Sequence, residues 1–147
     1  MILDKAETHR RNTRQRVALL ELLTSVTCHP SAQWLYEQLA ASCPGMSLAT
    51  VYRNLSLLAK EGKIRTLHCA GDTVRFDGDI GIHYHVVCSQ CGAIVDIPGD
   101  TGESTRLCEL AHRTSGYVVS DHSFDFYGIC PDCQSGNHTV LKDHQFL

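Results

Sequence analysis

The chain has 147 residues and a formal net charge of −3 at pH 7. It has no apolar run of 18 residues and no signal-peptide pattern, so we expect a soluble cytoplasmic protein of one domain or two small ones. Residues 1–76 hold 10 Lys and Arg against 6 Asp and Glu, whereas residues 77–147 hold 3 against 10. This division suggests a nucleic-acid-binding module joined to a metal-binding module.

Three helices are predicted in residues 14–62, because apolar residues recur there at helical spacing. The first covers Arg14 to Thr24, and its buried stripe is predicted to contain Val17, Leu20 and Leu23. Ser31 and Ser47 are good N-caps for the second and third helices. Gly62 is a good residue to end the third.

A small hairpin is predicted after the third helix. Residues 64–68 and 73–76 have the pattern of short strands, and Ala70–Gly71–Asp72 between them is typical of a turn. Three helices followed by a hairpin is the order of a winged-helix domain, whose third helix can enter the major groove of DNA. Tyr52 and Arg53 lie away from the apolar stripe of that helix, so they either face DNA or form an ordinary exposed pair.

Four of the eight cysteines form two C-x-x-C pairs, Cys88/Cys91 and Cys130/Cys133. Two residues between thiols allow both sulfurs to reach one tetrahedral ion, so the pairs predict a closed structural zinc site with four thiolates. Two redox dithiols or a pair of disulfides are the alternatives. The other cysteines are predicted to be small buried apolar residues: Cys28, Cys43, Cys69 and Cys108.

Residues 83–88 and 93–97 predict a second hairpin with Gly92 at its turn. Alternation along the strand places His83 and His85 on one face, where they could share a metal or be ordinary histidines. Asp96 stands among apolar residues, and a buried carboxylate needs a partner such as a metal.

Residues 105–113 predict a helix that ends before Gly116, and residues 117–127 predict a long strand leading to the second cysteine pair. Such a sheet has an open edge, which a second copy of a protein often covers. From Gln134 onward the chain is polar, and His138 and His144 are expected to be solvated rather than ligands.

Five segments together resemble the ferric uptake regulator (Fur) family of bacterial metal-dependent repressors, along nearly the whole chain. They are residues 14–16 (RQR), 29–32 (HPSA), 49–55 (ATVYRNL), 83–92 (HYHVVCSQCG) and 127–133 (YGICPDC). The resemblance implies an α+β fold in three parts: a winged-helix DNA-binding domain at residues 1–78, a hinge at 79–82, and an α/β dimerisation and metal-binding domain at 83–147 that contains the four-cysteine zinc site. It also implies a set of DNA contacts: Tyr52, Arg53, Thr50, Arg14 and Arg16.

The best resemblance within the family is to its peroxide-sensing branch. It implies a regulatory site for Fe²⁺ or Mn²⁺ formed by His29, Asp77, His83, His85 and Asp96. Nitrogen and oxygen donors without sulfur suit these metals. The resemblance also implies that peroxide oxidises His29 or His83 of the iron form, which would release the metal and the operator. The alternative is an iron, zinc, nickel or manganese uptake repressor, although the iron-uptake branch often has Glu where Asp96 stands.

Some members of the family have a further metal site with an acidic residue between the two histidines. Tyr84 stands at that position here, so the further site is predicted to be incomplete, even though His122 matches one of its ligands.

The expected partners are a palindromic double-stranded DNA operator and a second copy of the chain, with no membrane and no substrate other than metal ions and peroxide. Two enzyme classes fit poorly. A zinc hydrolase needs an open zinc position, and the sequence has no H-E-x-x-H motif. A thiol oxidoreductase needs a C-x-x-C that opens a helix, whereas Gly92 and an apolar run follow Cys91.

Overall fold

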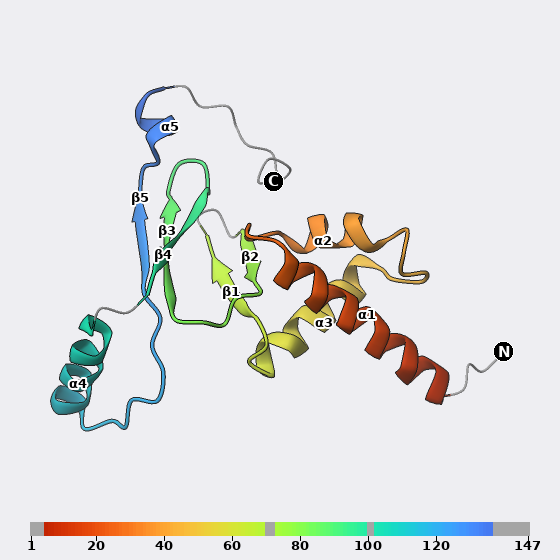
Figure 1. Cartoon of the computed structure of the whole chain (residues 1–147), viewed down its shortest axis with the longest axis horizontal. Coiled ribbons are helices and arrows are strands. Elements are labelled where there is room, and N and C mark those ends of the chain that lie inside the picture. Colours follow the sequence, from red (N-terminus) through yellow and green to blue (C-terminus); the bar gives the residue numbers. More distant parts are fainter. Residues whose placement is uncertain (1–4, 70–72, 100–101, 137–147) are drawn as a thin grey trace. The chain divides into compact units, whose positions relative to one another are not determined.

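The computed structural model describes residues 5–69, 73–99 and 102–136, and the side chains of residues 5–12 lie outside this description. The chain forms two compact units, the first reaching Ile80 and the second beginning at Gly81 (Figure 1). This boundary lies within residues 79–82, the segment that the sequence assigns to a hinge. None of the described helices combines the length and the apolar character that a membrane span requires.

The first unit begins with three helices, α1 (Lys5–Ser25), α2 (Ala32–Leu39) and α3 (Leu48–Lys60). The predicted N-caps are confirmed: Trp34 N donates to Ser31 Oγ at 3.2 Å, and Thr50 N donates to Ser47 Oγ at 3.2 Å. Gly62 follows α3 with φ +68°, a conformation that ends the helix. α1 begins nine residues earlier than predicted, because the polar sequence before Arg14 contains no helix breaker.

Side chains from all three helices and from the hairpin form the core of the first unit: Leu19, Leu23, Ala32, Leu35, Met46, Val51, Leu55, Leu58, Ile64 and Phe76. The prediction that Val17 is buried was wrong, because Val17 is 47% exposed and Leu19 takes its place in the core. Residues 17–23 are apolar at six of seven positions. Periodicity alone therefore could not choose which side of α1 faces inward.

The hairpin consists of β1 (Arg65–His68) and β2 (Val74–Asp77), paired antiparallel with Thr66 opposite Phe76. Phe76 N donates to Pro30 O at 3.0 Å, which ties β2 to the loop that carries His29. The predicted turn at residues 70–72 lies outside the described residues. Three helices and two wing strands confirm the predicted winged-helix architecture.

The second unit contains a mixed three-stranded sheet in the order β4–β3–β5. Its strands are β3 (His83–Cys88), β4 (Ile94–Pro98) and β5 (Asp125–Gly128), and its helices are α4 (Glu103–Ser115) and α5 (Pro131–Gln134). β3 pairs antiparallel with β4 and parallel with β5 (Figure 1). In this register His85 has Asp96 on one neighbouring strand and Asp125 on the other. The sheet thus places two carboxylates beside one imidazole.

The prediction of a long strand over residues 117–127 was wrong, because only residues 125–128 pair with β3. A strand persists where a neighbour satisfies its backbone groups, and among the described residues none pairs with 117–124. Tyr117 and Val118 are 75% and 89% exposed.

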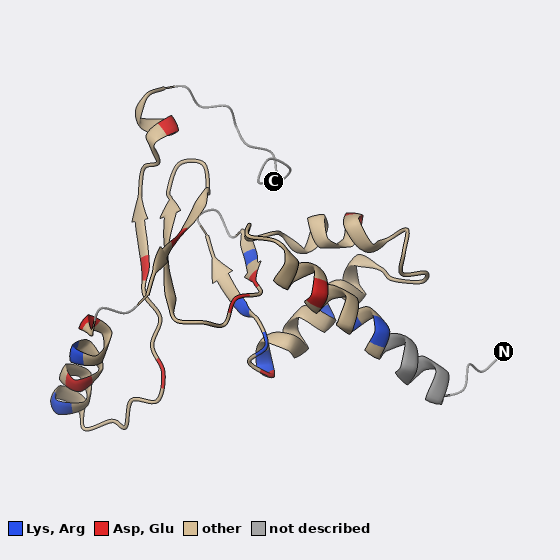
Figure 2. Cartoon of the chain, in the orientation of Figure 1, with Lys and Arg blue, Asp and Glu red and all other residues tan. Residues whose placement is uncertain are grey.

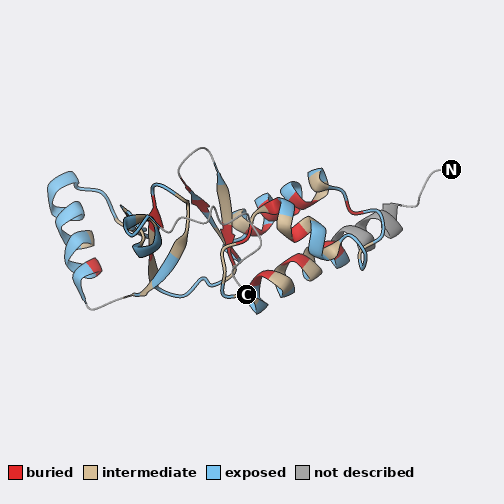
Figure 3. Ribbon diagram, turned by 90° about the horizontal axis from the view of Figure 1, so that it is seen from above, coloured by how far each residue is buried: buried red, intermediate tan, exposed pale blue. Residues whose placement is uncertain are grey.

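The helix after β4 begins at Glu103, two residues earlier than predicted, and Gly116 ends it with φ +74°. Most of α4 is exposed, with Ser104 as its buried residue (Figure 3). α5 was not predicted, although Pro131 at its first position is a typical start signal.

The four cysteines outside the C-x-x-C pairs only partly match the prediction of burial. Cys69 is buried, whereas Cys28, Cys43 and Cys108 are half-buried. Cys43 packs against the core of the first unit, so there the prediction was correct in kind. Cys28 lies in the loop before α2 and Cys108 lies on the exposed helix α4, and neither element buries its side chain completely.

Candidate metal centres and DNA-binding surface

Four cysteine sulfurs converge at the end of the sheet in the second unit. Cys88 ends β3, Cys91 lies in the turn that follows, Cys130 is the N-cap of α5, and Cys133 lies within that helix. Their Sγ atoms all lie within 4.8 Å of one another. The chain therefore brings both C-x-x-C pairs together, as their spacing predicted.

The distances between these sulfurs fit a bound ion and not disulfides. Cys88 Sγ lies 3.8 Å from Cys133 Sγ, and Cys91 Sγ lies 3.7 Å from Cys130 Sγ. A disulfide bond is about 2.05 Å long, whereas a tetrahedron with metal–sulfur bonds of about 2.3 Å has sulfur–sulfur edges of about 3.8 Å. The thiol cage has the size of a four-thiolate metal site.

Backbone groups around the cage favour the thiolate form of Cys88. Burial raises the pKa of its thiol, but hydrogen bonds from the backbone of Cys130, Cys91 and Gln90 outweigh burial and lower the pKa to about 6. Cys130 N, for example, lies 3.3 Å from Cys88 Sγ. Since a thiolate is the form that binds a metal, these hydrogen bonds favour Cys88 as a ligand.

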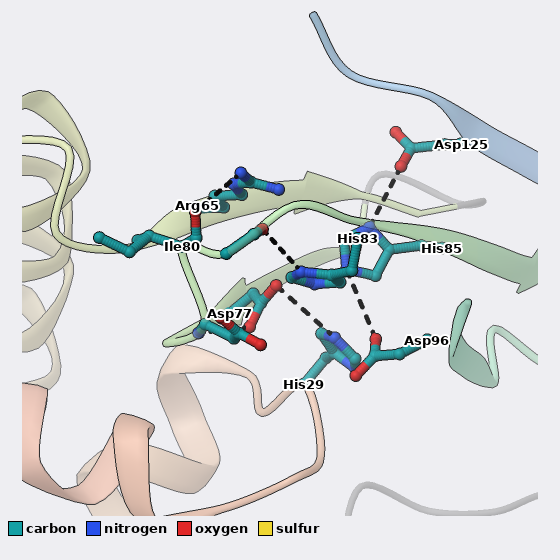
Figure 4. A network of polar contacts seen from close by, with 10 residues as sticks. His29, Arg65, Asp77, Ile80, His83, His85, Asp96 and Asp125 are labelled. Atoms are coloured by element: carbon teal, nitrogen blue, oxygen red, sulfur yellow. Dashed lines mark hydrogen bonds and ion pairs between the residues drawn. The ribbon is translucent and has the colours of Figure 1, made fainter. Parts of the chain in front are cut away.

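A second set of donors lies on β3 and β4 of the same unit. His83 Nε2 and His85 Nε2 are 3.0 Å apart, and His85 Nε2 is 3.6 Å from Asp96 Oδ1 (Figure 4). Ligand atoms of these three residues lie within 4.8 Å of one another. The side chain of Asp96 is 47% exposed. The expectation of a buried carboxylate was therefore wrong, because β4 is an edge strand, but the partner that Asp96 contacts is a candidate ligand.

The other ring nitrogen of each histidine faces an oxygen. His83 Nδ1 lies 3.0 Å from Gly81 O, and His85 Nδ1 lies 3.3 Å from Asp125 Oδ1. Both rings thus present Nε2 to the cluster. Asp125 was missed in the sequence, because only the register of β5 against β3 reveals that it lies beside His85.

The remaining two predicted ligands meet within the first unit. His29 Nε2 lies 3.9 Å from Asp77 Oδ2, and their side chains are only 5% and 8% exposed (Figure 4). Asp77 Oδ1 also accepts a hydrogen bond from Asp79 N at 2.8 Å, and Arg65 Nη2 donates to Ile80 O at 3.1 Å. The last residues before the unit boundary are therefore held to the winged-helix fold beside this imidazole–carboxylate pair.

His122 lies in an aromatic cluster. Its ring is 5.3 Å from that of Phe124 and 6.4 Å from that of Tyr84. Tyr84, at the position where some family members have an acidic ligand, thus packs its ring near His122. His138 and His144 lie outside the described residues.

The outer face of α3 carries the predicted DNA contacts. Tyr52 is 50% exposed and Arg53 is exposed, whereas Thr50 is half-buried near the Ser47 cap. On α1, Arg14 is exposed, and Arg16 Nη1 lies 3.2 Å from Glu61 Oε1. Figure 2 shows basic residues on α1, α3 and both wing strands of the first unit. These basic side chains have the charge that a DNA phosphate backbone would attract.

The model of the ferric uptake regulator family matches residues 7–127. The chain belongs to the ferric uptake regulator family. It is 40% identical over 135 residues to the peroxide operon regulator of Bacillus subtilis (strain 168), covering 90% of each chain. It is 36% identical over 124 residues to the peroxide-responsive repressor PerR of Staphylococcus aureus (strain USA300), covering 84% of this chain and 82% of the relative.

Among solved structures, the fold is similar to that of the Campylobacter jejuni peroxide stress regulator. The TM-score is 0.76 at 29% identity, over 90% of this chain and 99% of that one. Membership of the ferric uptake regulator family makes the chain a metal-dependent transcriptional regulator and not an enzyme. It also confirms the predicted α+β fold, in which a winged-helix domain precedes an α/β domain with a four-cysteine cluster.

Proposed function

We propose that the protein is a cytoplasmic, dimeric repressor that binds its operator when a regulatory Fe²⁺ or Mn²⁺ is bound, and releases it when peroxide oxidises the iron form. One observation carries the proposal: two donor sets of different chemistry occur in one chain, namely four thiols and a group of imidazoles with a carboxylate. The B. subtilis and S. aureus relatives are a peroxide operon regulator and a peroxide-responsive repressor, which supports the response to peroxide.

The four thiols suit structural Zn²⁺. Zinc prefers tetrahedral sulfur ligands, and a shell of four cysteines leaves no position for substrate or peroxide. Cys88 and Cys91 belong to one hairpin, and Cys130 and Cys133 belong to α5 and its N-cap, which follow β5, so the ion would hold the end of the sheet together. Its role would be to stabilise the second unit.

The imidazoles and carboxylates suit Fe²⁺ or Mn²⁺, which accept nitrogen and oxygen ligands. We assign His83, His85 and Asp96 of the second unit and His29 and Asp77 of the first to one regulatory site. An ion with ligands from both units would restrict how the winged-helix domain is oriented. Shifting a two-state protein from 1:99 to 99:1 requires about 5.5 kcal/mol of differential binding, which several metal–ligand bonds can supply.

Operator binding would use α3 as the recognition helix, with Tyr52 and Arg53 at the bases or phosphates and Thr50, Arg14 and Arg16 beside them. Two such helices must match half-sites about 34–36 Å apart, or multiples of that, on a palindromic operator. A dimer supplies both helices. Exposed apolar side chains of the second unit support dimerisation there: Tyr117, Val118, Phe126 and Tyr127.

The response to peroxide would depend on the ligands themselves. Bound Fe²⁺ would supply the electrons that split peroxide, chemistry that Mn²⁺ does not readily supply. The O–O bond of peroxide would break, one oxygen atom would be added to a ring carbon of His29 or His83, and the other would leave as water. The oxidised ring would lose its ability to bind the ion. The two units would no longer be held in the orientation that fits the operator, and the repressor would dissociate.

The decisive experiment compares operator binding by zinc-loaded protein with Fe²⁺ and with Mn²⁺, before and after brief peroxide treatment. The operator can be selected from random duplexes by the Mn²⁺ form. We expect peroxide to abolish binding by the Fe²⁺ form alone, with one added oxygen on the peptide of His29 or His83 in the mass spectrum. Metal-dependent binding that peroxide leaves intact would identify an uptake repressor instead. Oxidation confined to thiols would rule out the histidine mechanism.

A further inference from the structure

One carboxylate contacts a regulatory ligand without pointing into the cluster of ligand atoms. Asp125 of β5 lies beside His85, on the opposite side of its ring from His83 and Asp96 (Figure 4). We propose that Asp125 is a positioning residue that holds His85 in the one tautomer able to bind the regulatory metal. This inference rests on the regulatory site proposed above.

The sheet fixes this contact. Asp125 is the direct neighbour of His85 in the parallel pairing of β5 with β3, and Oδ1 lies 3.3 Å from Nδ1. The side chain of His85 is 4% exposed and that of Asp125 is 32% exposed. Water therefore has little access to the ring, and the carboxylate is the acceptor that the fold provides for its Nδ1 proton.

An ionised carboxylate can only accept a hydrogen bond, so it places the proton of neutral His85 on Nδ1. Nε2, the atom that faces the cluster, then carries the lone pair. The alternative tautomer has a ready partner, since His83 Nε2 lies only 3.0 Å from His85 Nε2. In that state His85 Nε2 would carry the proton and donate it to the lone pair of His83 Nε2. Neither nitrogen could then bind the metal.

His83 provides the internal comparison. Its Nδ1 lies 3.0 Å from the carbonyl oxygen of Gly81, so the backbone sets its tautomer. His85 depends on a side chain for the same purpose. Asp125 is not a ligand of the same ion, because it lies across the ring from Nε2 and stands outside the convergent group that contains His83, His85 and Asp96. Its effect must pass through His85.

The test uses zinc-loaded protein without a regulatory metal. Long-range ¹⁵N–¹H NMR of the histidine rings reports the tautomer of His85, and titration followed by electron paramagnetic resonance reports affinity for Mn²⁺. We compare Asp125→Ala, Asp125→Asn, which keeps the shape, and Asp125→Glu, which restores a carboxylate. Asp121→Asn is the matched control, since it removes the same charge from the same unit and Asp121 Oδ1 accepts a hydrogen bond from the backbone N of His122.

We expect His85 to carry its proton on Nδ1 in the wild type and to shift toward the Nε2 form in Asp125→Ala. Affinity for Mn²⁺ should fall about 10–100-fold, the usual effect of losing a residue that orients a metal ligand. Asp125→Asn should also lower the affinity for Mn²⁺, and Asp125→Glu should recover part of it. The affinity of Asp121→Asn should match that of the wild type. Zinc content and circular dichroism verify folding of each variant.

Wild-type affinity in a folded Asp125→Ala or Asp125→Asn variant would overturn the inference. So would a loss of affinity with an unchanged tautomer, or an equal loss in Asp121→Asn, because either would reduce Asp125 to a general negative charge. Failure of the wild type itself to bind Mn²⁺ would instead overturn the proposed regulatory site.

Discussion

The Nε2 atoms of His83 and His85 lie 3.0 Å apart on one face of β3, each ring with its Nδ1 directed at an oxygen. With both protons on Nδ1, the two Nε2 lone pairs are directed at a position that one cation can occupy. This arrangement explains why the pair suits a metal.

Replacement of His83 by alanine should abolish metal-dependent operator binding, because the regulatory ion loses a ligand. Zinc should remain at about one ion per chain, since the thiol cage is closed without histidine. Electrophoretic mobility shifts with and without Mn²⁺, together with zinc analysis, measure both effects. His112→Ala is the control, because His112 lies on α4 and contacts the carbonyl oxygen of Tyr117. Loss of zinc in the His83 variant would contradict our separation of the regulatory site from the four-cysteine site.

Cys130→Ser should release zinc and unfold the second unit, because a structural ion contributes its binding free energy to folding. Cys130 also donates its backbone N–H to the Cys88 sulfur, so loss of the cage disturbs both cysteine pairs. Zinc analysis, circular dichroism and sedimentation measure ion, fold and dimer. Cys108→Ser, at a half-buried thiol of α4, should leave all three unchanged. A stable Cys130→Ser dimer with a full complement of zinc would count against the four-thiolate site.

Arg53→Ala should weaken operator binding by about 1–3 kcal/mol while leaving thermal stability within about 0.5 kcal/mol of the wild type. The residue is exposed on α3, opposite the buried side chains of Val51 and Leu55. Tyr52→Ala should act in the same direction. Ser56→Ala, also exposed on α3, provides a comparison outside the proposed contacts. Equal affinities for the Arg53 and Ser56 variants would exclude this face of the helix as the DNA-reading surface.

Gly78→Ala should destabilise the first unit by about 1–3 kcal/mol, the usual cost of overpacking. A Cβ at this position would lie 2.7 Å from the backbone C and O of Leu23 and 2.9 Å from Thr24 N, and backbone atoms cannot move aside as a side-chain end can. Trp34, the single tryptophan, packs against the core of this unit, so its fluorescence follows unfolding.

Gly128→Ala is the comparison for that experiment, because a Cβ there would meet nothing within 4 Å. It should leave the Trp34 transition unchanged. An unfolding midpoint of Gly78→Ala at the same denaturant concentration as the wild type would contradict the prediction. It would show that the close approach of Gly78 to α1 does not constrain the segment before the second unit.

Features with a recognisable chemical signature were predictable from the sequence, and features that depend only on how strands or helix faces pack were not. The caps at Ser31 and Ser47 follow from local chemistry, and the convergence of the two C-x-x-C pairs follows from the four thiolates that a tetrahedral ion requires, so both were predicted correctly. The buried side of α1 was not, because Val17 and Leu19 are both apolar and only the packed core distinguishes them. Asp125 was missed for a similar reason, since its role depends on the alignment of β5 with β3.

β3 carries His83 and His85 at one end and Cys88 at the other, within six residues. Any reagent that removed a metal from the four-cysteine site would also release the end of the strand that carries both imidazoles. Thiol-attacking oxidants should therefore disable the protein by a second route, one that needs no iron and leaves every histidine chemically intact. Derepression alone would not reveal which route was taken, whereas the oxidation state of Cys88 would.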